Sequence, residues 1–486
     1  MSTAFMNTAA ATPFLVGAGS GASSTRPPVD VDLDRIEASA ADQPDAPAQT
    51  SYGPIRRWLL LSLLYTPLLA STVISKVSVP PFSGMGLGIG IPLTLMVTFV
   101  GMVCGAFVVD LRRFCLYVAL VSSACLSQAM ASGTFSITSI AFLIALFAPC
   151  VFGLRESAAA ESRVTTNDVL RAFASYATVF ALLGIVQYAI QFPLGPRVAF
   201  PIEFFLPRGF LVETYNYLNI LYYGSSIYKA NGLVFLEPSF FSQFTALGLL
   251  LELALWNRRS RLAIYLVALA VTYSGTGIMV LGAGLVTLVF VQRRWSVAMA
   301  ALVVVAVVVL FAEPLGLQSF VDRATEFQST GSSGFERFVA WLYVYKQYWW
   351  TGDLGTVLVG MGAGSFAGYS NSALYHAAEM SFSKVFFEFG IIGGLLYFAF
   401  LFQMVFASKL PLVFKVGMAV SLFLNQAYSM QVVGILLSVF AWPVPGGPVT
   451  RLRKSRRKPK ARPDLESGFD QRIEPVFDPT VSHRPL

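Results

Sequence analysis

The chain has 486 residues, of which 55% are hydrophobic and only 12% are charged. Soluble domains carry roughly 25% charged residues, so this composition excludes an ordinary soluble protein and indicates an all-α polytopic membrane protein. The net charge of +8 comes from basic clusters between apolar segments and in the C-terminal tail. That placement favours orientation against anionic lipid over binding of nucleic acid.

The cysteine and histidine content argues against disulfide and metal chemistry. The four cysteines lie in or beside apolar segments, which implies no disulfide framework. Two histidines leave little room for a metal cluster, and no nucleotide-binding fingerprint occurs in a strand–helix context. We therefore expect no metal site and no organic cofactor.

The chain begins with residues 1–56, a stretch rich in Ala, Ser, Thr, Pro and Asp. No basic region leads into an apolar core there, so this stretch is predicted to be a disordered cytoplasmic tail and not a signal peptide. Residues 57–445 are predicted to form one transmembrane domain. Residues 446–486 are predicted to form a second cytoplasmic tail, disordered and basic, that touches anionic lipid.

Apolar segments suited to crossing a bilayer recur along the predicted transmembrane domain. About 20 helical residues cross ~30 Å of hydrocarbon. The twelve predicted segments are Arg57–Ile74, Met85–Val109, Phe114–Met130, Phe135–Leu154, Val169–Gln191, Leu233–Trp256, Leu262–Tyr273, Ile278–Val291, Val297–Ala312, Val385–Phe406, Pro411–Asn425 and Met430–Trp442. Because four of these segments are short, we expect about 12 transmembrane helices, within a range of 10 to 14.

Basic residues between these segments predict the orientation of the chain. The Arg and Lys clusters all fall on one side if the twelve segments alternate in direction, and the positive-inside rule makes that side cytoplasmic. Both termini are then cytoplasmic. The two long loops, residues 192–232 and 313–384, face outward. Loops this long inside a compact domain are usually functional.

An acidic residue and a proline interrupt the apolar segment that follows the first outer loop. An ionised acid inside a membrane costs a few kcal/mol unless it lines a watered cavity. Pro238 is expected to break or start the helix there and to leave Glu237 at a helix N-terminus, near the outer surface. Glu237 then either caps this helix or faces a cavity beside Lys229.

The second outer loop offers two arginines, Arg323 and Arg337. Arg337 and Trp341 are four residues apart and would share one face of a helix. A guanidinium at the membrane surface can grip a phosphate with two parallel hydrogen bonds. The alternative is local ion pairing, of Arg323 with Glu326 and of Arg337 with Glu336.

His376 and Glu379 stand near the end of the second loop. If this stretch is helical, the two side chains lie on one face at i and i+3. An imidazole with a carboxylate in reach forms a general base with an orienting partner. The alternative is a histidine with a purely structural role.

Three motifs, in this order and membrane placement, resemble those of the O-antigen polymerase/ligase superfamily, which includes Wzy-type polysaccharide polymerases and WaaL-type ligases. The Glu-Pro-Ser form of the first motif is similar to that of exopolysaccharide polymerases. The matching stretches are Lys229–Gly232 with Glu237–Ser239, then Arg337 with Trp341 and the Gly360–Gly364 turn, then Glu388–Gly393. The resemblance spans roughly residues 169 to 442.

Three positions depart from the family's pattern. Lys229 stands where the family commonly has Arg, which keeps the charge but loses the bidentate fork. The family's His position falls on Glu379, and His376 comes three residues earlier. Ser274–Gly277 replaces the frequent Ser-Arg-Gly of a middle segment.

The resemblance implies a GT-C-like fold and a metal-independent glycosyltransferase on the outer face of the bacterial cytoplasmic (inner) membrane. It implies polymerisation of polyprenyl-diphosphate-linked oligosaccharide repeat units in exopolysaccharide or O-antigen biosynthesis. Membrane lipid and a chain-length regulator are further expected partners. The residues it assigns are Arg337, His376 and Glu379 to catalysis, with His376 or Glu379 as the base, and Lys229, Glu237, Arg208, Arg323 and Trp341 to substrate binding.

Two alternatives stay open. One is a ligase of the same superfamily that transfers finished glycan to another acceptor. The other is a transporter or flippase of lipid-linked sugars. Transporters tend to show repeated halves with charged groups at the membrane midplane, whereas here the charges crowd into two unequal outer loops.

Overall fold

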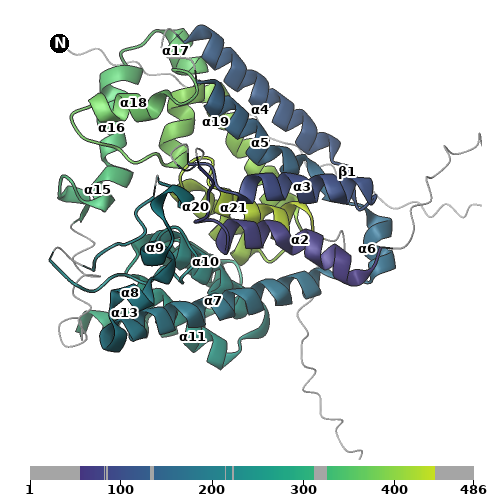
Figure 1. Cartoon of the computed structure of the whole chain (residues 1–486), viewed down its shortest axis with the longest axis vertical. Helices are drawn as coiled ribbons and strands as arrows, with labels where there is room; N and C mark the ends of the chain where they lie inside the picture. Colours follow the sequence, from purple (N-terminus) through teal and green to yellow (C-terminus); the bar gives the residue numbers. More distant parts are fainter. Residues whose placement is uncertain are drawn as a thin grey trace, which may run out of the picture. The chain divides into compact units, whose positions relative to one another are not determined.

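A computed structural model gives the structure of the protein for residues 55–443, apart from 81–82, 84–85, 132–135, 214, 222–223 and 311–325. The tails predicted at 1–56 and 446–486 therefore lie outside the described residues, except for residues 55 and 56. Arg323 lies outside them as well. The described chain is mostly helical (Figure 1).

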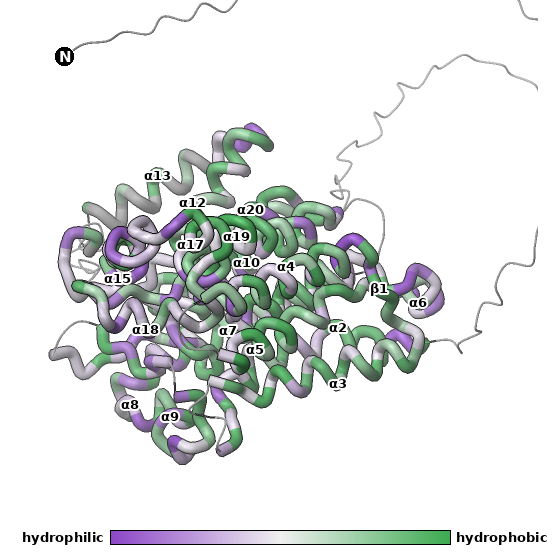
Figure 2. Tube along the Cα trace, turned by 90° about the horizontal axis from the view of Figure 1, so that it is seen from above, coloured by the Kyte–Doolittle hydropathy of each residue, from purple (hydrophilic) through white to green (hydrophobic). Residues whose placement is uncertain are grey.

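Four helices among the described residues are long and apolar enough to cross a membrane. They are α4 (Leu111–Met130), α7 (Thr166–Leu194), α10 (Pro238–Leu251) continued by the π-helical turn η4 (Glu252–Trp256), and α19 (Ser381–Ala407). Hydrophobic residues predominate along α4 and α10, whereas the short helices α6 (Glu156–Ser162) and α8 (Pro196–Ala199) are more hydrophilic (Figure 2). A mostly helical chain with several such helices is compatible with a polytopic membrane protein.

Each of the twelve apolar segments predicted from the sequence contains a helix. Besides the four long ones, the helices in these segments are α2 (Arg57–Thr72), α3 (Gly90–Val103), α5 (Ile137–Phe147), α11 (Arg259–Thr272), α12 (Gly275–Phe290), α13 (Trp295–Leu310), α20 (Leu412–Leu424) and α21 (Met430–Ile435). These eight are 6 to 16 residues long. Helix length alone therefore supports four membrane crossings, and the count of twelve stays a prediction.

Shorter elements connect these helices. They are β1 (Phe107–Val109), η2 (Ala148–Val151), β2 (Phe152–Leu154), α9 (Pro201–Phe205), η3 (Arg208–Phe210), η6 (Glu326–Gln328), α15 (Ser333–Phe338), α16 (Ala340–Val344), η7 (Tyr345–Trp349), α17 (Leu354–Val359), α18 (Ser365–Ser372) and η8 (Leu436–Ala441). The described part of the second long loop, from residue 326 onward, is thus a set of short helices. In Figure 1, α15 to α18 lie together on one side of α19, which α17 and α18 contact.

Two segment ends predicted as helix are strands instead. The segments Met85–Val109 and Phe135–Leu154 end in β1 and β2, which pair antiparallel with Phe107 opposite Leu154. Helix α3 stops because Gly105 adopts a positive φ of 69°, which glycine tolerates without steric cost. The guanidinium of Arg113 then holds this corner, donating to the Phe152 carbonyl at 2.9 Å.

Helix α10 is the most enclosed of the four long helices, and it positions the site described below. It packs against α7, α11, α12 and α20, with every residue except Ser239 buried. The α10–α12 contact is close, since a Cβ on Gly277 would lie 2.7 Å from Ser242. The N-terminus of α10 is therefore held firmly where the first outer loop ends.

Candidate functional site

An ion pair between Glu237 and Arg337 joins the N-terminus of α10 to the second long loop. Glu237 is the N-cap residue of α10, as the sequence predicted from Pro238. Arg337, 100 residues later on α15, places its Nη2 atom 3.4 Å from Glu237 Oε2. Their side chains are 15% and 26% exposed. Glu237 makes no side-chain cap to its own helix and instead accepts hydrogen bonds from Arg337 and, at 3.0 Å, from the hydroxyl of Ser239.

This pairing answers two open questions from the sequence. Arg337 pairs with Glu237 at the N-terminus of α10, and not locally with Glu336. Glu237 was expected beside Lys229 if it faced a cavity, whereas its observed ion-pair partner is Arg337. Lys229 is half-buried on the chain before α10, where its amide donates to the carbonyl of Asn219 at 2.8 Å.

The expected shared helix face of Arg337 and Trp341 is wrong. Helix α15 ends at Phe338, Val339 has a non-helical φ of −120°, and α16 starts at Ala340. The indole of Trp341 donates to the Phe338 carbonyl at 3.0 Å, which closes the break between the helices. Its ring packs edge-on against two aromatic rings, those of Tyr345 and Phe382.

The expected helix that would pair His376 with Glu379 is also absent. Helix α18 ends at Ser372, and residues 376–379 are irregular. The hydroxyl of Ser370 bonds to both the amide and the carbonyl of Ala377, at 2.7 and 2.9 Å, which folds the chain back and prevents a further helical turn. His376 is exposed, and it forms no side-chain hydrogen bond with the rest of the described chain.

Glu379 nevertheless lies close to the backbone that carries Arg337. The amide of Ala378 donates to the carbonyl of Glu336 at 2.9 Å, so the segment that ends in Glu379 is joined to α15. The Glu379 side chain forms an ion pair with Lys384, in the first turns of α19. Sequence reasoning gave Lys384 no role.

Lys384 lies between two carboxylates. Besides Glu379, its Nζ atom is 3.7 Å from Glu388 Oε1, one helical turn further along α19. Glu388 is completely buried and also accepts from the Phe366 amide at 3.3 Å and from the Tyr428 hydroxyl at 3.4 Å. The i, i+4 spacing of Lys384 and Glu388 was the only signal in the sequence that could have pointed to this lysine.

Tyr215, in the first outer loop, connects the two acidic groups electrostatically. Burial raises the pKa of its hydroxyl, and the negative charges of Glu237 and Glu379 raise that pKa further. Both carboxylates are therefore within electrostatic reach of one hydroxyl that stays protonated. Its ring centre lies 6.0 Å from that of Phe240, on the first turn of α10.

The glycine turn of the second motif docks onto a break in α19. Gly390 has a φ of 66°, which interrupts the helix. The amides of Met361 and Gly362 donate at 3.0 Å to the carbonyls of Phe387 and Glu388, which the break leaves without helical partners. The Gly360–Gly364 turn therefore supports α19 and the Lys384–Glu388 region.

A second buried ion pair organises the first outer loop, and the sequence did not reveal it. Lys76, fully buried after α2, pairs with Glu203 of α9 and donates to the Leu233 carbonyl at 2.6 Å. Burial lowers the pKa of Lys76 to about 8, with Glu203 acting in the opposite direction. Asn231, the third residue of the first motif, donates to Glu203 at 3.0 Å and accepts from Gln187 at 2.9 Å. Lys76 lies two residues after the end of a predicted span, so in the sequence it resembles an ordinary flanking charge.

Not all the predicted cations join the Arg337–Glu237 pair. Arg208 is exposed on η3, and its guanidinium forms no ion pair with any described residue. Arg323 lies outside the described residues. Among the residues that the structure describes, no group of His, Cys, Asp and Glu side chains is arranged to hold a metal ion.

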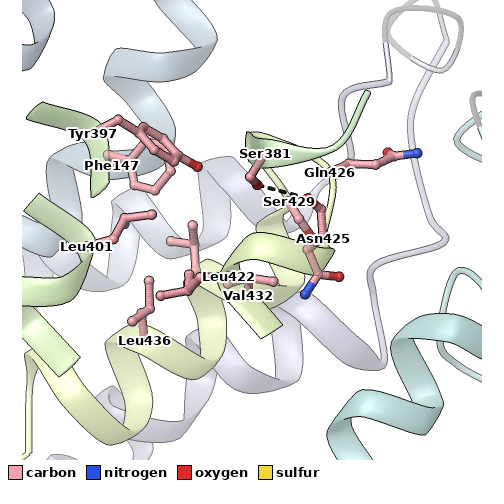
Figure 3. A pocket seen from close by; sticks show the side chains of 11 residues that line it. Phe147, Ser381, Tyr397, Leu401, Leu422, Asn425, Gln426, Ser429, Val432 and Leu436 are labelled. Carbon is pink, nitrogen blue, oxygen red and sulfur yellow. Dashed lines mark hydrogen bonds between the residues drawn. The ribbon is translucent and has the colours of Figure 1, made fainter. Parts of the chain in front are cut away.

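A small cavity lies deeper in the fold, between α19 and the α20–α21 connection (Figure 3). Its lining includes Ser381, Tyr397, Asn425 and Ser429, and Ser381 donates to the Asn425 carbonyl at 2.8 Å. The cavity volume is about 10 Å³, close to what a single water molecule needs. A sugar ring does not fit there, so the Arg337–Glu237 region remains the candidate site.

In comparisons with known proteins, no family model, no curated protein and no solved structure matches the chain.

Proposed function

We propose that the protein is a metal-independent glycosyltransferase that polymerises polyprenyl-diphosphate-linked oligosaccharide repeat units in exopolysaccharide or O-antigen biosynthesis. It would work on the outer face of the bacterial cytoplasmic membrane, with about 12 crossings and both termini inside. The observation that carries the proposal is the Arg337–Glu237 pair at 3.4 Å. It brings together two charged residues that the sequence singled out, one at the start of the segment after the first long loop and one in the second long loop.

The chemistry needs a cation more than a strong acid, because the leaving group is a diphosphate. A guanidinium has five N–H donors, and only one of those of Arg337 contacts Glu237. The remaining donors would hold diphosphate oxygens as negative charge develops on them. Losing one such preorganised group typically costs on the order of 10²–10³ in rate. Lys229, Arg208 and Arg323 would add positive charge around the same diphosphate.

The second requirement is a base for the acceptor sugar. Its hydroxyl oxygen forms a bond to the anomeric carbon of the donor, while the bond from that carbon to the diphosphate oxygen breaks and leaves its electron pair on the diphosphate. Glu379 or His376 would take the hydroxyl proton, worth roughly 10²–10⁴ in rate. The half-buried ring of Trp341 would contact sugar.

A test uses the lipid-linked glycans of cells that lack the protein. Loss of the glycan ladder, with a single repeat unit left on its lipid carrier, is the outcome expected for a polymerase. Intact polymer stranded on the carrier would instead indicate the ligase. Repeat units trapped on the inner face would indicate a flippase and overturn the proposal.

A further inference from the structure

Lys384 joins an accessible carboxylate to a buried one. Glu379, on the irregular segment before α19, has a side chain that is 39% exposed, whereas that of Glu388 is completely buried. Lys384 itself is 11% exposed and lies 5.5 Å from the centre of the Tyr428 ring. The Lys384 ammonium therefore lies between the Glu379 and Glu388 carboxyl groups in a largely buried environment.

The two carboxylates differ in their other partners. Glu388 accepts hydrogen bonds from the Phe366 amide and the Tyr428 hydroxyl as well as lying near Lys384. The side chain of Glu379 has Lys384 as its one hydrogen-bond partner among the described residues. Glu379 therefore keeps free lone pairs on its exposed side, where an acceptor hydroxyl can reach it.

We propose that Glu379 is the base of the proposed glycosyl transfer and that Lys384 is its positioning residue, which pairs with the Glu379 carboxylate until Glu379 takes the proton and then pairs with Glu388. This inference rests on the proposed function and deepens it. The acceptor hydroxyl proton moves to a Glu379 oxygen, the acceptor oxygen bonds to the anomeric carbon, and the diphosphate leaves with the electron pair. Lys384 keeps its proton throughout.

The surrounding charges fit this transfer. Before the reaction, Lys384 lies between the Glu379 and Glu388 carboxyl groups, and proton uptake by Glu379 leaves it paired with Glu388. Tyr215 and Tyr428 face this set: the negative charge of Glu379 raises the pKa of Tyr215, and the Lys384 ammonium lies 5.5 Å from the centre of the Tyr428 ring. His376 lies three residues from Glu379 on the same segment. The Lys384–Glu388 pair thus remains satisfied after Glu379 loses its charge.

The experiment measures kcat and KM between about pH 5 and pH 9 for the full-length protein in lipid nanodiscs, given a synthetic polyprenyl-diphosphate oligosaccharide. A cation within about 4–6 Å lowers a carboxyl pKa by about 1–3 units. Lys384→Met should therefore move the acidic limb of the pH–rate profile upward by about one unit or more. It should lower kcat at pH 7 about 10²-fold and leave KM nearly unchanged. Lys384→Arg should restore the position of the limb.

Two further variants separate this role from a structural one. Lys346→Met removes an exposed lysine of the same loop and should change neither kcat nor the limb. Because Lys384→Met leaves Glu388 as a buried charge without its cation, it can fail to fold. The double variant Lys384→Met with Glu388→Gln removes that charge, and it should show the same shift of the limb.

The contrary outcomes are distinct. If the acidic limb moves in neither the single nor the double variant, the role proposed for Lys384 is overturned. The proposed function still stands in that case, provided that the wild-type protein elongates glycan. A loss in His376→Gln as large as that in Glu379→Gln would assign the base to the histidine. Wild-type protein that elongates no glycan would remove the proposed function and this inference together.

Discussion

At the scale of single residues, the proline that follows Glu237 determines where its carboxylate lies. Pro238 has a fixed φ and no amide hydrogen, so it starts a helix well and places the preceding residue at the N-terminus. The structure confirms that position for Glu237. No local sequence pattern predicts that Arg337 is the partner of Glu237. The two residues are 100 positions apart, so their pairing depends on how the chain packs and not on sequence spacing.

Arg337 yields the first prediction. Arg337→Ala should abolish long polymer and let single lipid-linked repeats accumulate, because the departing diphosphate loses its cation. Arg337→Lys should recover part of the activity, since an ammonium keeps the charge but not the bidentate fork. Gel analysis of lipid-linked glycans at matched protein levels measures both. Arg259→Gln, a change at an exposed arginine at the start of α11, is the control, and normal polymer from Arg337→Ala would exclude Arg337 from the mechanism.

Lys76 yields a prediction about stability. Removing one partner of a buried ion pair typically costs about 3–5 kcal/mol, because the other charge stays buried and unpaired. Lys76→Met should therefore lower the yield and the melting temperature of the purified protein, and Lys76→Met with Glu203→Gln should recover most of the loss. Thermal unfolding in detergent gives both values. Equal melting temperatures for wild type and Lys76→Met would show that this pair does not hold the first loop.

Among the helices, the length of the apolar runs predicted a helix in each of twelve segments but not where the chain breaks or turns. All twelve segments contain a helix, because in lipid a helix satisfies its backbone hydrogen bonds within one segment. The break at Val339 and the end of α18 at Ser372 depend on bonds that only the fold supplies, such as that from the Ala378 amide to the Glu336 carbonyl. The expected His376–Glu379 helix failed for this reason.

The break in α19 yields the element-scale prediction. A Cβ on Gly390 would lie 2.3 Å from the carbonyl oxygen of Leu358, and its φ of 66° is itself strained for other residues. Gly390→Ala should lower the melting temperature by at least about 5 °C, since a loss of 1 kcal/mol already shifts it by about 2–4 °C in a domain of 150–250 residues. Gly282→Ala, in α12 with open space around it, is the matched control and should be neutral or stabilising. A Gly390→Ala protein as stable as Gly282→Ala would show that the glycine turn does not depend on this break.

For the molecule as a whole, basic residues serve the fold as well as the predicted orientation. Arg258 pairs with the buried Glu252 of η4, Arg294 donates to the Leu253 carbonyl at 2.6 Å, and Arg113 donates to the Ala441 carbonyl at 2.7 Å. Each bond satisfies a group at or near the end of a helix. Cationic side chains are favourable at helix C-termini. The basic clusters that the positive-inside rule assigns to the cytoplasmic side therefore also stabilise the helix ends near them.

The orientation itself can be tested with single cysteines placed in a variant that lacks the four native ones. Lys346 in the second loop and Lys409 between α19 and α20 are both exposed, and the positive-inside rule assigns them to opposite sides. A membrane-impermeant maleimide should label Lys346→Cys in intact spheroplasts and Lys409→Cys only after permeabilisation. The reverse pattern would put Arg337 and Glu379 in the cytoplasm. Lipid-linked repeats presented on the outer face could not reach them there, and the proposed reaction would lose its location.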